Sequence, residues 1–297
     1  MKVIKSITTT DAILTSSNIT ETEYAAWVSN ATYAIAARVI YQHKIYEAVL
    51  GHTNKTTPPD LDLVNWMPIS YTNKYRMFDN IISNSSSRVG GINFRLTPSQ
   101  VIDSIVFLNV NAATVRIIMT DPVQGVVYDR TQVLSSVDNT VDYYSYFFAP
   151  VGLKKTSALF LGLPSYPTAT IDAYIDSGAA LVEVGEVIYG QQMVIGRTNY
   201  GTSIGIKSYS RKEIDEFGNV EVVKRKNSKF AEYDIDIDNY KLAEVQRYFA
   251  EIDSIPSVFI GNPDMEELVV FGFYNDFKAT ISFPTISKCS LRVEGLV

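Results

Sequence analysis

Short runs of apolar and β-branched residues recur through the middle of the chain at a spacing of roughly ten residues. The clearest runs are residues 104–110 and 113–119, followed later by 158–163 and 170–175. Each run has the length of one strand, and the spacing leaves room mainly for turns between strands. Regularly spaced short strands are typical of two antiparallel sheets packed face to face. We therefore predict an antiparallel β-sandwich of jelly-roll type over residues 89–190.

The residue composition predicts a mostly β protein with a large buried core. Of the 297 residues, 46% are hydrophobic and 20% are charged, which excludes general disorder. Val, Ile, Thr and Tyr, which favour strands, are plentiful. Changes in pattern divide the chain into a small aromatic β module (1–88), the sandwich (89–190) and a C-terminal β-rich domain with one helix (191–297).

The distribution of charge and apolar residues limits the partners of this chain. The formal net charge is −6, and Lys and Arg form no long basic block. Because binding to phosphates requires clustered cations, we expect no nucleic-acid partner. We also expect no membrane span, since no stretch approaches ~18 uninterrupted apolar residues. Residues 1–6 lack the apolar core of a signal peptide. We expect a product that is made and kept in a reducing cytoplasm, or assembled there into something larger, with the only cysteine, Cys289, buried in a strand.

The first segment contains the signals of a small, self-contained module. Thr20 and Glu23 have the spacing of a capping box, which predicts a short helix through Trp27. Two short strand-like runs, 38–41 and 44–49, are separated only by Gln42 and His43, which predicts a tight hairpin. The polar stretch that leads from residue 83 to the glycine pair at 90 and 91 predicts a boundary loop.

The last segment predicts a charged hairpin, several strands and one helix. Residues 212–226 alternate polar and apolar positions around a turn-forming centre at 217–219. Residues 233–238 alternate strictly, as in a half-buried strand. The apolar positions of 239–252 fall on one helical face, with Asp238 or Asn239 as the expected N-cap. Further strands are expected at 268–274, at 279–283 and from 290 to the last residue.

One motif could indicate a catalytic serine. Residues 201–205 match the pattern G-x-S-x-G, which presents a nucleophilic serine when a strand precedes it and a helix follows. That serine, Ser203, also needs a later histidine to accept its proton. The residues that follow indicate strand and loop, and both histidines, His43 and His52, lie upstream. We therefore interpret the motif as a β-turn, and we expect no catalytic residue and no enzymatic activity.

The sequence predicts neither a metal site nor a cofactor. His43 and His52 lack a nearby cysteine, whereas zinc uses about three or four ligands at tighter spacing. Asp234, Asp236 and Asp238 share one face of a predicted strand, but calcium prefers a curved loop with about six to eight oxygens. We expect a solvated acidic face, or one that meets a basic partner. No glycine-rich phosphate-binding motif is present in the sequence.

The aromatic residues of the first segment follow the order W…Y…V-x-Y…Y-x-A…P…W. The residues in this order are Trp27, Tyr33, Val39, Tyr41, Tyr46, Ala48, Pro58 and Trp66. The pattern resembles the small chitin-binding-type carbohydrate-binding modules that accompany bacterial glycosidases. The resemblance implies sugar stacking on Tyr41 or Trp66 where these rings are exposed. The same rings have a structural interpretation, because a module this small cannot build its core from aliphatic residues alone.

A second resemblance begins directly after this module. Residues 72–79 resemble the N-[RK]-[WY]-x-M-F-D ending that follows such modules in tail-associated phage proteins. The last third is similar to the same proteins at 184–190, 200–201, 209–212 and 270–277. This resemblance implies a structural protein of the tail or baseplate in a tailed-bacteriophage virion, with other virion proteins as partners.

The leading hypothesis is a tail or baseplate component that acts through subunit interfaces in a symmetric homo-oligomer, either a ring or a trimer. The charges of the hairpin at 212–226 are too many to be buried within one subunit, so this hairpin is expected to meet a neighbour. The residues of the expected assembly surface are Lys224, Arg225, Lys226, Asp234 and Asp236. The alternative is a glycan-binding virion adhesin whose first module contacts the host surface.

Overall fold

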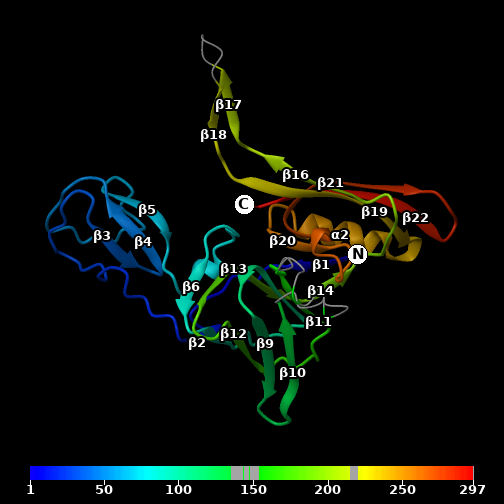
Figure 1. Cartoon of the computed structure of the whole chain (residues 1–297), viewed down its shortest axis with the longest axis horizontal. Coiled ribbons are helices and arrows are strands. Elements are labelled where there is room, and N and C mark those ends of the chain that lie inside the picture. The colour runs from blue at the N-terminus through cyan, green and yellow to red at the C-terminus, as the bar shows by residue number, and fades with distance from the viewer. Residues whose placement is uncertain (135–142, 144–146, 148–153, 215–219, 297) are drawn as a thin grey trace.

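The computed structural model describes residues 1–134, 143, 147, 154–214 and 220–296. Within these ranges the chain is a mostly β protein made of several antiparallel sheets, which confirms the predicted fold class. Figure 1 shows a small module on one side, a sandwich beneath, and a C-terminal sheet from which a long hairpin projects.

The sandwich is formed by eight consecutive strands. They are β6 (Ser86–Val89), β7 (Ile92–Leu96), β8 (Ser104–Asn111), β9 (Thr114–Asp121), β10 (Gly125–Val133), β11 (Ala158–Leu161), β12 (Thr170–Asp176) and β13 (Leu181–Gly190). One sheet has the order β6-β13-β8-β11, and the other has the order β7-β12-β9-β10 with β2 (Leu14–Ser17) beside β7. This interleaving of two Greek keys is the connectivity of a jelly roll, as predicted.

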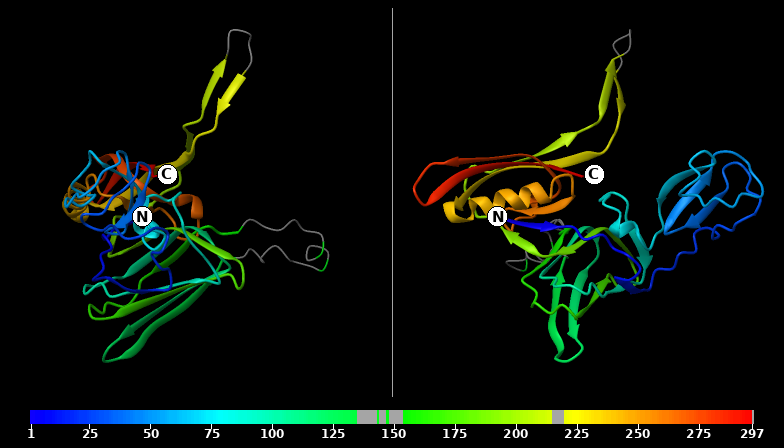
Figure 2. Two further views of the ribbon diagram at one scale, coloured as in Figure 1. Left: turned by 90° about the vertical axis from the view of Figure 1, so that its left-hand side faces the viewer. Right: turned by 180° about the vertical axis from the view of Figure 1, so that it is seen from behind.

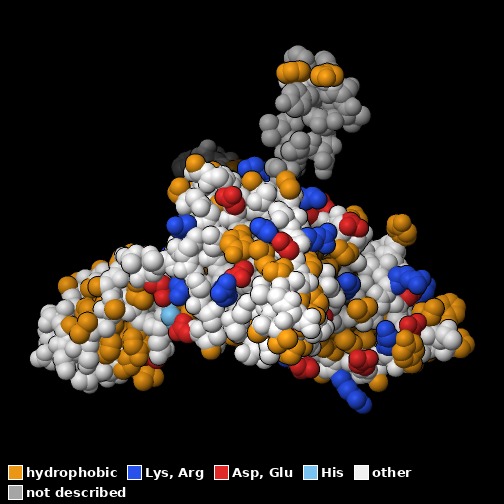
Figure 3. All heavy atoms as spheres, turned by 90° about the horizontal axis from the view of Figure 1, so that it is seen from below, with side chains coloured by type: hydrophobic (Ala, Val, Ile, Leu, Met, Phe, Trp, Pro, Cys, Tyr) orange, Lys and Arg blue, Asp and Glu red, His pale blue; other side chains and the backbone are white. Residues whose placement is uncertain are grey.

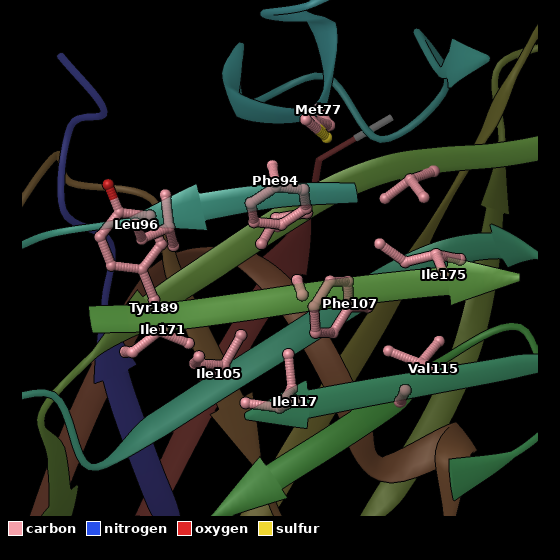
Figure 4. Close-up of a cluster of buried hydrophobic side chains, with 14 of the residues drawn as sticks. Met77, Phe94, Leu96, Ile105, Phe107, Val115, Ile117, Ile171, Ile175 and Tyr189 are labelled. Carbon is pink, nitrogen blue, oxygen red and sulfur yellow. The ribbon is translucent and has the colours of Figure 1, made fainter. Parts of the chain in front are cut away.

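Alternation along the strands places every second side chain between the two sheets of the sandwich. Phe94 on β7 and Phe107 on β8 face each other across this core, with 6.4 Å between their ring centroids (Figure 4). Ile117 on β9 and Ile171 on β12 lie in the same core and are almost fully buried. Strands β8 and β9 follow each other directly in sequence but belong to opposite sheets, so the short link between them crosses the sandwich.

The C-terminal sheet contains eight strands and is covered by a helix. The strands are β1 (Lys2–Lys5), β14 (Gln192–Val194), β15 (Arg197–Thr198), β16 (Ser203–Ser208), β19 (Asn227–Asp238), β20 (Ser257–Ile260), β21 (Val269–Ile281) and β22 (Ile286–Gly295). Helix α2 (Leu242–Glu251) follows the 3-10 turn η2 (Asn239–Lys241), and its buried Val245 and Phe249 pack on the sheet. Tyr233, Ile235 and Ile237, the alternate residues of β19, share this core and confirm the predicted half-buried strand.

Two details of the C-terminal segment differ from the prediction. Strand β21 is continuous, whereas we expected separate strands at 268–274 and 279–283, because a β-bulge keeps it paired with β22 through its polar middle. The helix has no side-chain cap. The expected cap residue Asn239 instead donates to the backbone oxygens of Phe283 and Pro284, at 2.9 Å each, and so holds the turn between β21 and β22.

The small module is built on a three-stranded sheet. Its strands are β3 (Arg38–Tyr41), β4 (Lys44–Ala48) and β5 (Trp66–Tyr71). The turn residues Gln42 and His43 have φ angles of 45° and 63°, as in a two-residue hairpin turn, so the predicted hairpin is confirmed. The helix expected through Trp27 is wrong, because the carboxylates of Glu21 and Glu23 bond to distant parts of the chain instead of capping a helix.

Residues 1–88 contribute strands to four different sheets. Strand β1 pairs with β14 and β20 of the C-terminal sheet, and β2 pairs with β7 of the sandwich. Strands β3 to β5 form the module between them. The boundary loop expected over 83–91 contains strand β6, which pairs with β13. The serine-rich sequence indicates a loop, so this strand was not predicted. In the structure Ser86 is fully buried, and its hydroxyl accepts a hydrogen bond from the backbone N–H of Met77 at 2.9 Å.

Candidate assembly surface

The charged hairpin projects from the C-terminal sheet as an arm (Figures 1 and 2). It consists of β17 (Arg211–Ile214) and β18 (Val220–Val223), which pair antiparallel as predicted, and its tip lies outside the described residues. Within the described part of the chain no other strand pairs with it. Val220, Val222 and Val223 are exposed along β18. A two-stranded ribbon with bare edges and exposed valines is marginally stable in water, so contact with another surface stabilises it.

Three consecutive cations stand at the base of this arm. Lys224, Arg225 and Lys226 are all exposed. The ammonium of Lys226 donates to the hydroxyl of Ser83 at 2.5 Å, which ties the base to the loop before β6. Among the described residues, the charged groups of Lys224 and Arg225 have no partner. The predicted basic part of the surface is therefore exposed.

A network around Glu294 fixes the direction in which the arm leaves the sheet. Its carboxylate accepts hydrogen bonds from the Lys207 ammonium at 2.6 Å, from the Tyr209 hydroxyl at 2.9 Å and from the Asn275 amide at 3.3 Å. The bonds from Lys207, Tyr209 and Asn275 lower the pKa of Glu294 to about 2. Glu294 therefore stays ionised at neutral pH and holds the strand that leads into the arm.

A cavity of about 630 Å³ lies under the base of the arm, between the sandwich and the C-terminal sheet. Its apolar lining includes Leu108 from the sandwich and Phe271 from the C-terminal sheet. Lys229 lines it together with the three cations of the arm base. The arm base thus combines an apolar hollow with positive charge, which suits an acidic partner that also carries apolar groups.

The acidic residues lie toward the other end of β19. Asp234 and Asp238 are exposed on the face of the sheet opposite to α2, and Asp236 is half-buried. Asp236 lies opposite Lys288 of β22, and one of its carboxylate oxygens is buried without a hydrogen-bond partner. At about 3.3 Å per residue, roughly 30 Å of strand separates these aspartates from Lys226. The structure therefore does not bring the predicted acidic and basic residues together within one chain.

The aromatic residues of the small module divide into core and surface. Trp66 is only 1% exposed and packs edge-on against Tyr33 and His52, at 5.0 Å from each ring. The expectation of sugar stacking on Trp66 is therefore wrong, because its side chain is buried in the module core. Tyr41 is half-buried and packs edge-on against Trp27 at 5.5 Å. This pair is a partly exposed aromatic surface of the module.

The serine motif has the geometry of a strand. Ser203 begins β16 and lies opposite Glu232 of β19, and β16 continues to Ser208 with no helix after the motif. Both histidines of the chain lie in the small module. The arrangement of a nucleophile elbow is absent at Ser203. Within the described ranges there is also no group of three His, Cys, Asp or Glu residues that could hold a metal ion.

The sequence prediction missed a polar cluster at the neck of the module, where the chain enters and leaves it (Figure 3). His43, in the turn of the module hairpin, lies 3.0 Å from Asp11 through Nε2 and 3.0 Å from Glu21 through Nδ1. Its ring stacks on Tyr75 with centroids 4.0 Å apart. Thr72 donates to Glu21 at 2.6 Å, and Tyr75 donates to Asp11. No sequence spacing connects these residues, since Asp11 and Tyr75 are 64 positions apart.

The motif at 72–79 follows this neck into the sandwich. Asn73 exchanges two hydrogen bonds of 2.8 Å with the backbone of Ser87, and Met77 is fully buried. Asp79 accepts hydrogen bonds from the backbone of Ile81 and the amide of Asn84, yet burial raises its pKa to about 6. The motif therefore anchors the module to the sandwich.

Two comparisons with known proteins found no relative of this chain. No protein-family model matches the chain, and a search of curated proteins found no match. Among the described residues, no helix is long and apolar enough to cross a membrane.

Proposed function

We propose that this chain is a structural component of a bacteriophage tail or baseplate that acts through subunit interfaces in a symmetric assembly. The observation that carries the proposal is the arm, which projects from the sheet with exposed valines and has two cations at its base without a partner among the described residues. The tail context rests on the sequence resemblance at 72–79 and in the last third of the chain.

The separation of charge along β19 supports contact between copies. The basic base of the arm and the acidic aspartates are too far apart to neutralise each other within one chain, so each is available to the opposite charge on a neighbour. Strand β16 adds an open edge, because it pairs only with β19 among the described strands, and Ile206 on it is 69% exposed. A head-to-tail contact of this kind closes into a ring when its rotation permits.

Reversing the charge at the base of the arm is expected to abolish assembly. In the triple variant Lys224→Glu, Arg225→Glu and Lys226→Glu, the base repels the acidic end of the next subunit instead of attracting it. We expect the purified variant to lose the oligomers that native mass spectrometry or negative-stain images detect for the wild type. Wild-type oligomers should weaken at high salt, because the contacts are between exposed charges.

A matched control separates this effect from a general change of net charge. Lys55, Arg130 and Arg247 are exposed residues of the module, the sandwich and the helix, and their reversal changes the net charge by the same amount. This control is expected to assemble normally, and both variants are expected to keep the wild-type circular dichroism. Normal assembly of the arm variant would exclude this surface from the interface.

The second candidate function is glycan binding through the small module, which the half-buried pair of Trp27 and Tyr41 favours. Aromatic rings at a surface present a flat apolar face of the kind on which a sugar ring packs. If this function holds, the full-length chain binds glycans on an array, and Tyr41→Ala reduces the signal about tenfold or more. Ile35→Ala, at a 69% exposed position of the same module, is the control expected to leave it unchanged. An array without signal for the wild-type chain rejects this candidate.

A further inference from the structure

The neck of the module contains a histidine held between two carboxylates. Nε2 of His43 lies 3.0 Å from Oδ2 of Asp11, and Nδ1 lies 3.0 Å from Oε1 of Glu21. An ionised carboxylate only accepts hydrogen bonds, and a neutral imidazole has a single N–H. Both contacts are therefore hydrogen bonds only when His43 carries two protons and a positive charge.

The three residues of this clamp belong to different parts of the chain. Asp11 lies in the turn that precedes β2, outside the module. Glu21 lies on the segment that enters the module, and His43 lies in the hairpin turn of the module itself. The clamp therefore joins the module to the sandwich at a point where two chain segments provide the only covalent connection. It adds to the two hydrogen bonds between Asn73 and Ser87, which also hold the module at this point.

Asp11 and Tyr75 keep their charge states near neutral pH. Hydrogen bonds from Tyr75 and His43, together with the nearby Lys74 ammonium, lower the pKa of Asp11. Burial and the hydrogen bond to Asp11 raise the pKa of the Tyr75 hydroxyl. Asp11 thus remains a carboxylate, and Tyr75 remains a donor to it. Histidine is the side chain whose charge ordinarily changes within this range of pH.

We propose that His43, Asp11 and Glu21 form a pH-dependent clamp that docks the small module onto the sandwich and releases it when the imidazole loses a proton. A neutral His43 keeps only one of its two carboxylate contacts and faces the other with a lone pair. Loss of one charge-assisted hydrogen bond, with repulsion in its place, corresponds to a change of about tenfold or more in the ratio of docked to released module. The clamp does not depend on the assembly proposed above.

Single-molecule energy transfer on the full-length chain tests the clamp. Dyes on Thr56→Cys in the module and Val123→Cys in the β9–β10 turn occupy exposed positions, while the native Cys289 is buried. We expect one narrow distance distribution near pH 6 and a broad one near pH 9, where imidazole is neutral. An unchanged distribution across this range overturns the proposal.

Two variants and one control identify the source of the pH dependence. In Asp11→Asn, the new amide donates to the bare nitrogen of a neutral His43 and still accepts from Tyr75, so the module should stay docked near both pH values. In His43→Gln, the positive charge is lost, so the distance distribution should be broad at both pH values. Glu23→Gln changes a neck carboxylate that bonds the backbone of Asn73 and not the imidazole, so it should keep the wild-type pH response. A wild-type response in Asp11→Asn would refute the clamp.

Discussion

Glu186→Gln is expected to raise the free energy of unfolding by about 3 kcal/mol near pH 7 and to leave it almost unchanged near pH 4.5. Glu186 lies on β13 and is 1% exposed. Burial, with a smaller contribution from the nearby Asp79, raises its pKa to about 9 from an ordinary value of 4.5. One of its carboxyl oxygens is buried without a hydrogen-bond partner. The protein therefore folds with this group neutral.

The direction in which pH changes the free energy of unfolding follows from the number of protons that the folded and unfolded states bind. Between the ordinary and the raised pKa, folded Glu186 keeps a proton that the unfolded chain releases, so stability falls as pH rises through this range. About 2.5 pH units at about 1.4 kcal/mol each set the size of the effect near pH 7. Glutamine has the same shape and does not titrate. The free energy of unfolding of the variant therefore does not fall with pH through this group.

Urea denaturation at a series of pH values measures the difference. Glu183→Gln, three residues earlier on the same strand, is the matched control, because its carboxylate lies at the surface and accepts a hydrogen bond from the Asn111 amide at 3.2 Å. The control is expected to differ from the wild type by less than about 0.5 kcal/mol at every pH. A Glu186→Gln difference that does not grow with pH would show that the carboxyl is solvated in the folded protein.

The strands of this protein could be predicted where one local pattern decided them. Residues 233–238 and the hairpin around His43 follow directly from alternation and turn chemistry. Strand β6 was missed because its polarity indicates a loop, and only its pairing with β13 makes it a strand. The continuity of β21 likewise depends on a long-range partner, β22. Pairing between distant segments is not encoded in a short window of sequence.

In the candidate site, too, features set by local sequence could be predicted and features set by long-range contacts could not. The exposure of Lys224 and Arg225 could be predicted from charge density alone. The burial of Trp66 could not, because the resemblance to carbohydrate-binding modules fits a core ring and a binding ring equally well. The neck cluster was invisible in the sequence, since His43 meets Asp11 only after the hairpin folds back onto the sandwich. The capping-box pattern at Thr20 and Glu23 instead predicted the start of a helix in this segment.

Trp66→Ala is expected to unfold the small module while the sandwich stays folded. Replacing a buried tryptophan by alanine costs about 3–5 kcal/mol. The hydrophobic cluster at the core of this module contains four buried side chains, those of Val39, Tyr46, Ala48 and Trp66, with four partly buried residues packed against it. A core this small has little stability to lose. The indole N–H of Trp66 is buried without a partner, so its removal offsets only a minor part of the loss.

The fluorescence of Trp27 reports this unfolding directly, because Trp27 is then the only tryptophan in the chain and lies in the module. We expect its emission to shift to the red in Trp66→Ala, while a cooperative transition of the remaining β structure persists in circular dichroism. Met67→Ala, at the neighbouring position that is 47% exposed, should leave the emission of the module unchanged. If Trp66→Ala instead removed the transition of the whole chain, the module and the sandwich would form one cooperative unit. The clamp at His43 would then hold the two parts together too firmly to act as a release.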